Sequence, residues 1–169
     1  MTAPGPQMVT PIVVIGVGNR FRGDDGVGPM VIRHLQGTLA EDVITEVVSG
    51  EATDLMACWD HAKAVILIDA AWGAEAPGSV IRLDLRTDAV PLAVADPSSH
   101  GLGVAEAIRM ATALGTRPKE FIIFSIVGEN FEHRETLSPM VAQAAWSTAI
   151  NVRKDVKALR HRLYASTNA

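Results

Sequence analysis

Cysteine is almost absent from the sequence, which has a single one, Cys58, among 169 residues. One cysteine excludes an intramolecular disulfide and any cysteine-based metal cluster within this chain, and it fits a reducing compartment. No stretch approaches the ~18–20 uninterrupted apolar residues of a membrane-spanning helix. Residues 1–10 also lack the basic and apolar regions of a signal peptide. We therefore expect a cytoplasmic protein that does not enter a membrane.

Basic residues are scarce as well, with 15 Lys and Arg against 19 Asp and Glu and a net charge of −4 at pH 7. No dense basic run precedes the C-terminal segment, which argues against nucleic acid as a partner. Apolar residues make up 48% of the chain and charged residues 20%, a profile typical of a soluble globular protein. The length favours one domain. We expect a disordered leader over residues 1–10 and a single α/β domain over residues 11–165.

Short β-branched runs alternate with segments of helical periodicity along the chain. Strands are predicted at residues 12–16, 43–49, 64–69, 79–85 and 121–127, and the first, third and last of them have the continuous apolar sequence of buried parallel strands. Helices are predicted at residues 27–39, 55–59, 102–114 and 138–163. This order predicts a three-layer α/β/α sandwich with a mostly parallel, twisted central sheet.

The first predicted strand runs into a glycine-rich loop, GVGNRFRGDDGVG at residues 16–28. Gly18 and Gly23 have the spacing of a phosphate-binding loop, but Asp24 and Asp25 stand where that motif has Lys and Ser or Thr. Two carboxylates would repel a nucleotide phosphate. The third glycine of a dinucleotide-binding fingerprint is also missing. We therefore expect the loop to hold a cation, and a nucleotide-binding domain is the weakest alternative.

Three polar residues fall where the carboxyl ends of the parallel strands are expected to meet. Asp25 lies in the glycine loop, Asp69 ends the third predicted strand, and His100 stands shortly before the third predicted helix. Ligands of such sheets bind beyond this edge. Two carboxylates and one imidazole form a three-ligand set for a divalent cation such as zinc, nickel or manganese, with coordination positions left open.

Each of these residues also has an ordinary structural explanation. Asp24 or Asp25 would stabilise the following helix by ~1 kcal/mol as a cap, and Asp24 is the one that we expect to turn into the loop and order it. Asp69 would accept hydrogen bonds from loop amides, and a lone histidine such as His100 is more often a loop residue than a ligand. The functional interpretation depends on the coincidence of three residues at one edge.

Taken together, these residues resemble the nickel–iron hydrogenase maturation endopeptidases. The resemblance rests on the glycine loop, IDA at residues 68–70, SHGLG at 99–103, VGE at 127–129 and LSPMV at 137–141. It covers about residues 11–152, and the motifs are more specific in this order than each is alone. The resemblance implies an α/β/α fold and a peptidase that removes a short C-terminal extension from the hydrogenase large-subunit precursor after nickel insertion.

The resemblance also implies a site and a metal. Nickel carried by the substrate would be recognised by Asp25, Asp69 and His100, which would serve as both metal ligands and catalytic residues, and zinc or cadmium could replace nickel in a crystal. Many members have Glu where this chain has Asp25, whose reach is shorter by ~1.5 Å. The residues expected to shape the loop are Gly18, Asn19, Gly23, Asp24 and Gly26.

Two mechanisms are compatible with this ligand set. The metal could polarise the scissile carbonyl or lower the pKa of a bound water, or it could position the substrate while the carboxylates act as bases. The sequence contains neither HExxH nor GxSxG, and Cys58 has no obvious histidine base beside it, which disfavours a cysteine protease.

One alternative is a checkpoint or chaperone that senses nickel on the large subunit without cutting it. The sequence does not separate this alternative from a peptidase, because both would use the same ligands. Trp72 and Phe131 are expected in loops near the same edge. There they would form either a substrate-docking surface or ordinary lid packing.

Overall fold

The computed structural model describes residues 12–89 and 101–165. Five strands form one sheet in the order β2-β1-β3-β5-β4. The parallel strands are β1 (Ile12–Val17), β2 (Val43–Val48), β3 (Ala64–Ala71) and β5 (Glu120–Val127). β4 (Val80–Asp84) pairs antiparallel with β5 at one edge. The mostly parallel sheet predicted from the sequence is confirmed.

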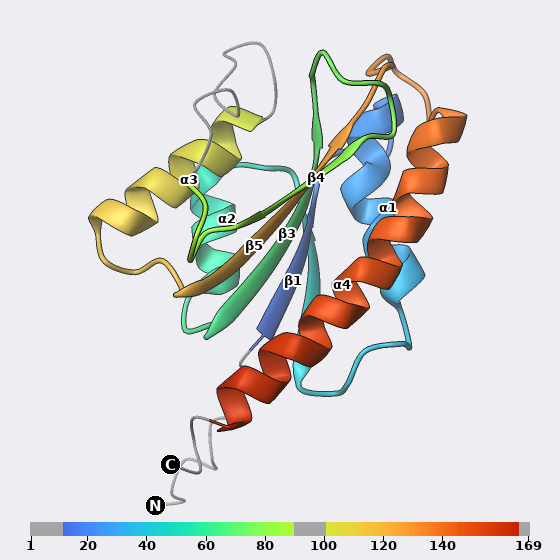
Figure 1. The fold of residues 1–169 in the computed structure, drawn as a ribbon. Helices are drawn as coiled ribbons and strands as arrows, with labels where there is room; N and C mark the ends of the chain where they lie inside the picture. The colour runs from blue at the N-terminus through green and yellow to red at the C-terminus, as the bar shows by residue number, and fades with distance from the viewer. Residues whose placement is uncertain (1–11, 90–100, 166–169) are drawn as a thin grey trace, which may run out of the picture.

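Helices cover both faces of this sheet (Figure 1). One face carries α1 (Val27–Leu35) and α4 (Pro139–Ala165), and the other carries α2 (Ala52–Trp59) and α3 (Gly101–Ala113). This arrangement is the expected three-layer α/β/α sandwich. Among the helices of the described residues, none is long and apolar enough to cross a membrane.

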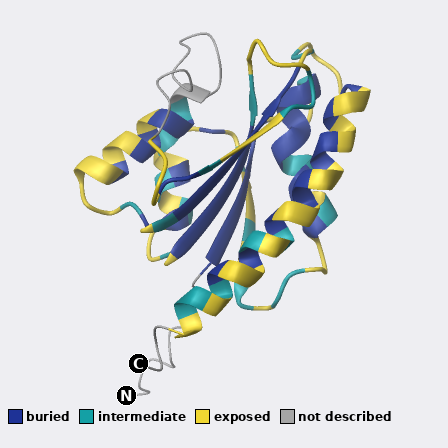
Figure 2. Ribbon diagram, in the orientation of Figure 1, coloured by how far each residue is buried: buried dark blue, intermediate teal, exposed yellow. Residues whose placement is uncertain are grey.

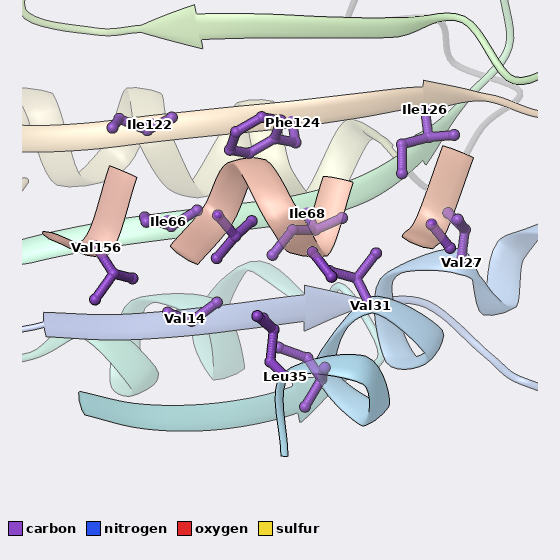
Figure 3. Packing of buried hydrophobic residues seen from close by; sticks show 14 of the residues in the cluster. Val14, Val27, Val31, Leu35, Ile66, Ile68, Ile122, Phe124, Ile126 and Val156 are labelled. Atoms are coloured by element: carbon purple, nitrogen blue, oxygen red, sulfur yellow. The ribbon is translucent and has the colours of Figure 1, made fainter. Parts of the chain in front are cut away.

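The core consists of two apolar clusters, one on each face of the sheet. In β1, Ile12 and Val14 pack with α1 and α4, whereas Val13 and Ile15 pack with α2 and α3. Figure 2 shows that the central strands are buried along their length, and Figure 3 shows the packing of the α1/α4 cluster around the labelled Phe124. Burial on both faces explains why these strands have continuous apolar sequences.

Helix α1 is shorter than the sequence pattern predicted. It ends at Leu35, because Gln36 has a ψ of 129° and Gly37 adopts a positive φ of 71°. Leu39, the expected last residue, still packs partly buried against the α1/α4 cluster. The apolar periodicity therefore continues beyond the helix because the following turn also contributes to the core.

The order in which the strands are added to the sheet reverses after β2, so β2 and β3 lie on opposite sides of β1. Helix α1 connects β1 to β2 at the sheet edge, and α2 then crosses the other face to β3, on the opposite side of β1. In open α/β sheets, ligands bind beyond the carboxyl ends of the strands at this switch point. The loop after β1 contains Asp25, and β3 contains Asp69 close to its end, so the fold directs both to this point.

Candidate active site

The loop after β1 folds tightly around Asp25. Gly18 has a φ of 128°, and a Cβ there would lie 1.9 Å from the carbonyl oxygen of Asp25. Gly23 has a φ of 56°, and a Cβ there would lie 2.3 Å from the carbonyl oxygen of Asn130. Only glycine adopts these conformations without strain and leaves space for the close contacts. In this chain, Gly18 and Gly23 have the spacing of a phosphate-binding loop, but they let the backbone pack closely around Asp25.

Asp25 belongs to a short 3-10 turn, η1 (Gly23–Gly26), that leads into α1. The residue is only 1% exposed, and its Oδ2 accepts a hydrogen bond of 2.8 Å from the backbone N–H of Asn19. Among the described residues, no donor reaches Oδ1 of Asp25. One oxygen therefore orients the side chain, and the other is left for a ligand.

The expectation that one of the two aspartates caps α1 is wrong. Gly26 occupies the N-cap position of α1, and the cap has no side-chain hydrogen bond. The turn η1 likewise begins after Arg22 without a side-chain cap. Both carboxylates point elsewhere, so neither is explained by stabilisation of the helix end.

Asp69 lies within β3 near its carboxyl end and is 5% exposed. Its Oδ1 accepts a hydrogen bond of 2.8 Å from the backbone N–H of Ala70. Burial and, after it, the negative charge of Asp25 raise the pKa of Asp69 to about 8, against the opposing effect of the Ala70 hydrogen bond. The repulsion between the two carboxyl groups indicates that the fold brings them to one place, and that Asp69 holds a proton at neutral pH.

A pair of buried carboxyl groups suits a cation. Two like charges in one apolar site resist simultaneous ionisation, and a divalent cation would displace the proton and neutralise both groups. Among the described residues, no three His, Cys, Asp or Glu side chains are placed to hold a metal. The third predicted ligand, His100, lies outside the described residues. The structure thus places the two predicted oxygen ligands together, and the imidazole stays a prediction.

The described start of α3 lies beside the end of β2. A Cβ at Gly103 would lie 1.8 Å from the carbonyl oxygen of Gly50, which has a φ of 103° just after β2. This contact requires a glycine on the helix side, since any side chain would overlap the backbone. The first turn of α3 is therefore held at the same edge of the sheet as the loop that contains Asp25.

Asp24 binds a distant part of the chain instead of a ligand. Its Oδ2 accepts hydrogen bonds from the N–H groups of Glu129 (2.9 Å) and Asn130 (3.0 Å). The N–H of Ser138 donates to Oδ1 (2.7 Å), and the Ser138 hydroxyl donates to Oδ2 (2.9 Å). Burial alone would raise the pKa of Asp24, but the hydrogen bonds outweigh it and hold that pKa below its ordinary value.

These bonds attach the segment between β5 and α4 to the glycine loop. The backbone adds three further hydrogen bonds between the segments: Gly23 N–H to the Arg134 carbonyl, Asp24 N–H to the Asn130 carbonyl, and Arg134 N–H to the Phe21 carbonyl. The VGE and LSPMV motifs overlap the two ends of this segment, and the sequence predicts that the second motif begins the last helix. In the structure both motifs also supply donors for Asp24.

Trp72 and Phe131 form a stacked aromatic pair at the same edge, with ring centroids 4.4 Å apart and planes at 26°. Phe131 packs over Gly128, where a Cβ would lie 2.6 Å from the ring. Trp72 is 56% exposed and follows Asp69 by three residues. The pair packs as a rim of the site, and Trp72 keeps an accessible surface.

Cys58 does not have the properties of a nucleophile. It lies half-buried in α2, and burial together with the charges of Glu46 and Asp54 raises the pKa of its thiol. A raised pKa lowers the fraction of reactive thiolate at neutral pH. This agrees with the sequence argument against a cysteine protease.

Replacement of Gly18 by alanine tests whether the loop needs its close approach to Asp25. We expect Gly18→Ala to destabilise the protein by at least ~3 kcal/mol, because strain at positive φ adds to the overlap with the Asp25 carbonyl. Gly37→Ala is the matched control, since Gly37 also has a positive φ but nothing lies within 4 Å of its Cβ position. That change should cost ~1 kcal/mol. Equal losses in urea unfolding would contradict the close approach.

Comparisons with known proteins agree with the geometry. The sequence profile of a family described as hydrogenase maturation protease (HycI) matches residues 29–152. The hydrogenase 2 maturation protease of Escherichia coli (strain K12) is 28% identical over 137 residues, which span 77% of this chain and 80% of that protein.

Solved structures with the same fold include two that are named HybD. The hydrogenase maturating endopeptidase HybD from E. coli superposes with a TM-score of 0.65 at 23% identity and covers 85% of this chain and 92% of that chain. The [NiFe] hydrogenase maturation protease HybD from Thermococcus kodakarensis gives a TM-score of 0.65 at 19% identity over 86% of this chain and 97% of that chain. Because the family profile spans well over half of its length, the chain belongs to the hydrogenase maturation protease family.

Proposed function

We propose that this peptidase removes a C-terminal peptide from the large-subunit precursor of a nickel–iron hydrogenase once the precursor carries nickel. The observation that supports the proposal is the buried pair Asp25 and Asp69 at the switch point of the sheet. A buried carboxyl pair in which Asp69 holds a proton in the free protein gains a positively charged partner when a cation arrives. Such a site would distinguish a precursor that carries metal from one that does not.

In this proposal nickel belongs to the substrate, and the enzyme supplies the groups that meet it. Asp25, held by Asn19, and Asp69, held by Ala70, each present an oxygen that accepts no hydrogen bond from the described residues. His100 would complete the set as a nitrogen ligand. A bound divalent ion supplies a positive charge that can polarise a nearby carbonyl group.

Asp69 also has the properties of a group that exchanges a proton near neutral pH. Its pKa of about 8 lies close to the pH at which a general acid or base works best. The proton that Asp69 holds in the free enzyme would leave as the cation binds, and the freed carboxylate could then accept a proton from the attacking water. We expect the reaction to occur in the cytoplasm, in line with the cysteine content.

The test is incubation with a large-subunit precursor, in nickel-loaded and nickel-free forms, followed by intact mass analysis. We expect the wild type to remove a C-terminal peptide from the nickel-loaded form only. Asp25→Ala, Asp69→Ala and His100→Ala should leave it intact, while circular dichroism shows that each variant is folded. A nickel-loaded precursor that binds the wild type and remains whole would contradict the proposal and favour a checkpoint role. Cleavage by the variants would show that the site is wrong.

A further inference from the structure

A groove of about 650 Å³ extends from the glycine loop along α1. Its apolar lining includes Met30 from α1, Val47 from β2 and Leu137 from the segment before α4. Val47 is 50% exposed and lies on β2, the parallel strand at the edge of the sheet. The groove therefore offers apolar surface beside the candidate active site.

Two exposed arginines, Arg20 and Arg33, line the same groove. Within residues 12–89 and 101–165, neither has a carboxylate at ion-pair distance, and the recorded contact of the Arg20 guanidinium is with the Phe21 ring, at 4.7 Å. Glu135 is the one acidic side chain among the described residues that line the groove. The groove thus has an excess of positive charge on a chain whose net charge is −4.

Some other arginines of the described chain are neutralised by ion pairs, whereas exposed Arg109 has no carboxylate at ion-pair distance among the described residues. Ion pairs join Arg82 to Asp155 at 2.8 Å, Arg86 to Asp84 at 2.7 Å and Arg160 to Asp42 at 3.2 Å. Arg20 and Arg33 both retain the capacity to bind a carboxylate, and they lie together in one groove. A guanidinium group forms paired hydrogen bonds with a carboxylate, so such a site selects acidic side chains.

One end of the groove is lined by Gly26, the residue after Asp25. Arg20 directly follows Asn19, whose N–H binds Asp25, and a Cβ at Gly26 would lie 3.0 Å from the Arg20 Cα. From Gly26 to Arg33 the chain advances seven residues, about 10 Å along a helix. An extended peptide covers that distance with about three residues. A substrate chain that leaves Asp25 along α1 would therefore bring its next few residues past both arginines.

We propose that this groove binds an acidic segment of the large-subunit precursor beside the cleaved bond, with carboxylates at Arg20 and Arg33 and apolar side chains against Met30 and Val47. The inference rests on the proposed function, since it takes the precursor as the occupant. Charge complementarity supports an acidic occupant, because a chain with a net charge of −4 attracts an acidic partner only where its surface is locally positive, as in this groove. The groove would orient the precursor so that its C-terminal region enters the site.

The test compares four proteins: the wild type, Arg20→Glu with Arg33→Glu, Arg20→Lys with Arg33→Lys, and Arg109→Glu. Arg109 is exposed on α3, on the opposite face of the sheet, and serves as the charge control. Binding is read from the fluorescence anisotropy of a labelled, nickel-loaded precursor, and cleavage from the intact mass of the same samples. Thermal unfolding shows whether each variant is folded.

We expect the double reversal to weaken binding at least ~10-fold at low ionic strength, and the difference to shrink in ~0.5 M salt. The double lysine variant should bind the precursor with an affinity within ~3-fold of the wild type, because the positive charge is retained. Arg109→Glu should bind the precursor with the affinity of the wild type. Unchanged affinity after the double reversal, or an equal loss with Arg109→Glu, would overturn the inference. If the wild type cuts the precursor and the double reversal binds it with unchanged affinity, the proposed function stands and the groove proposal fails. If the wild type neither binds nor cuts the precursor, both proposals fail.

Discussion

Replacement of Asp69 by asparagine is expected to abolish cleavage and, at alkaline pH, to make the protein more stable. Asparagine keeps the shape of the side chain and an oxygen for the Ala70 N–H, but it has no carboxylate. The loss of an acid–base group lowers the rate by ~100- to 10,000-fold, and the loss of a charged metal ligand lowers it further. We therefore expect cleavage to fall at least ~1,000-fold.

The stability effect follows from the raised pKa of Asp69. In the folded protein this pKa is about 8, against an ordinary value of 3.8. Between these values the native state holds a proton on Asp69 that the unfolded state has lost, so the contribution of Asp69 to stability falls as the pH rises from ~4 to ~8. The asparagine side chain of Asp69→Asn does not ionise, and the variant lacks this fall. At pH 9 the variant should be more stable, by a few kcal/mol as an order of magnitude, and the difference should be smaller at pH 5.

Urea unfolding of both proteins between pH 5 and pH 9 measures this effect. Asp84→Asn is a matched control, since Asp84 is also buried at the end of a strand. The Arg86 side chain, opposed by burial, lowers the pKa of Asp84. Its contribution is therefore present at neutral pH and is lost as the pH falls, so Asp84→Asn should destabilise at pH 7. Parallel stability curves for the wild type and Asp69→Asn would contradict the placement of Asp69.

Replacement of Asp24 by alanine should unfold the active-site edge. The change removes the acceptor for the N–H groups of Glu129, Asn130 and Ser138. Each buried donor left without a partner costs ~1–3 kcal/mol, so we expect a total loss of ~4 kcal/mol and a decrease in Tm of roughly 10 °C. Cleavage should be lost as well, because the same loop carries Asp25.

Calorimetry measures the total loss of stability in Asp24→Ala, and hydrogen exchange shows which part of the chain is destabilised. Amides of the segment between β5 and α4 should lose protection in Asp24→Ala and keep part of it in Asp24→Asn, which retains one acceptor oxygen. Asp54→Ala is the control, since Asp54 is an exposed aspartate of α2. A loss below ~1 kcal/mol for Asp24→Ala, or unchanged exchange in this segment, would show that Asp24 does not hold the two segments together.

The layers of this fold could be predicted because each buried strand has a continuous apolar sequence of its own. The apolar runs around Val14, Ile66 and Ile123 mark strands covered on both faces, and the alternation of strands and helices implies a parallel sheet. The end of α1 was placed too late, since Leu39 continues the apolar pattern after the helix has stopped at Leu35. Apolar periodicity indicates which residues are buried, and residues of a turn after a helix can be buried as well.

The two carboxylates of the candidate site could be located from topology, but their properties could not. The switch-point rule placed Asp25 and Asp69 at one edge, whereas the raised pKa of Asp69 depends on burial that the sequence does not record. The partners of Asp24 lie 105 to 114 residues away, beyond the reach of any local pattern. Similarly, Arg20 and Arg33 meet on one groove only after α1 has packed on the sheet. The assignment of His100 stays a prediction.

The measurement that tests the central claim most directly is an NMR titration of the Asp69 side-chain carboxyl carbon in the wild type and in Asp25→Asn. The account predicts that Asp69 titrates near pH 8 in the wild type. In Asp25→Asn it should titrate lower, since a negative charge has gone, but still above its ordinary value because burial remains. Titration of Asp69 near its ordinary value of 3.8, or a titration that Asp25→Asn leaves unchanged, would contradict the claim that these two carboxyl groups share one site.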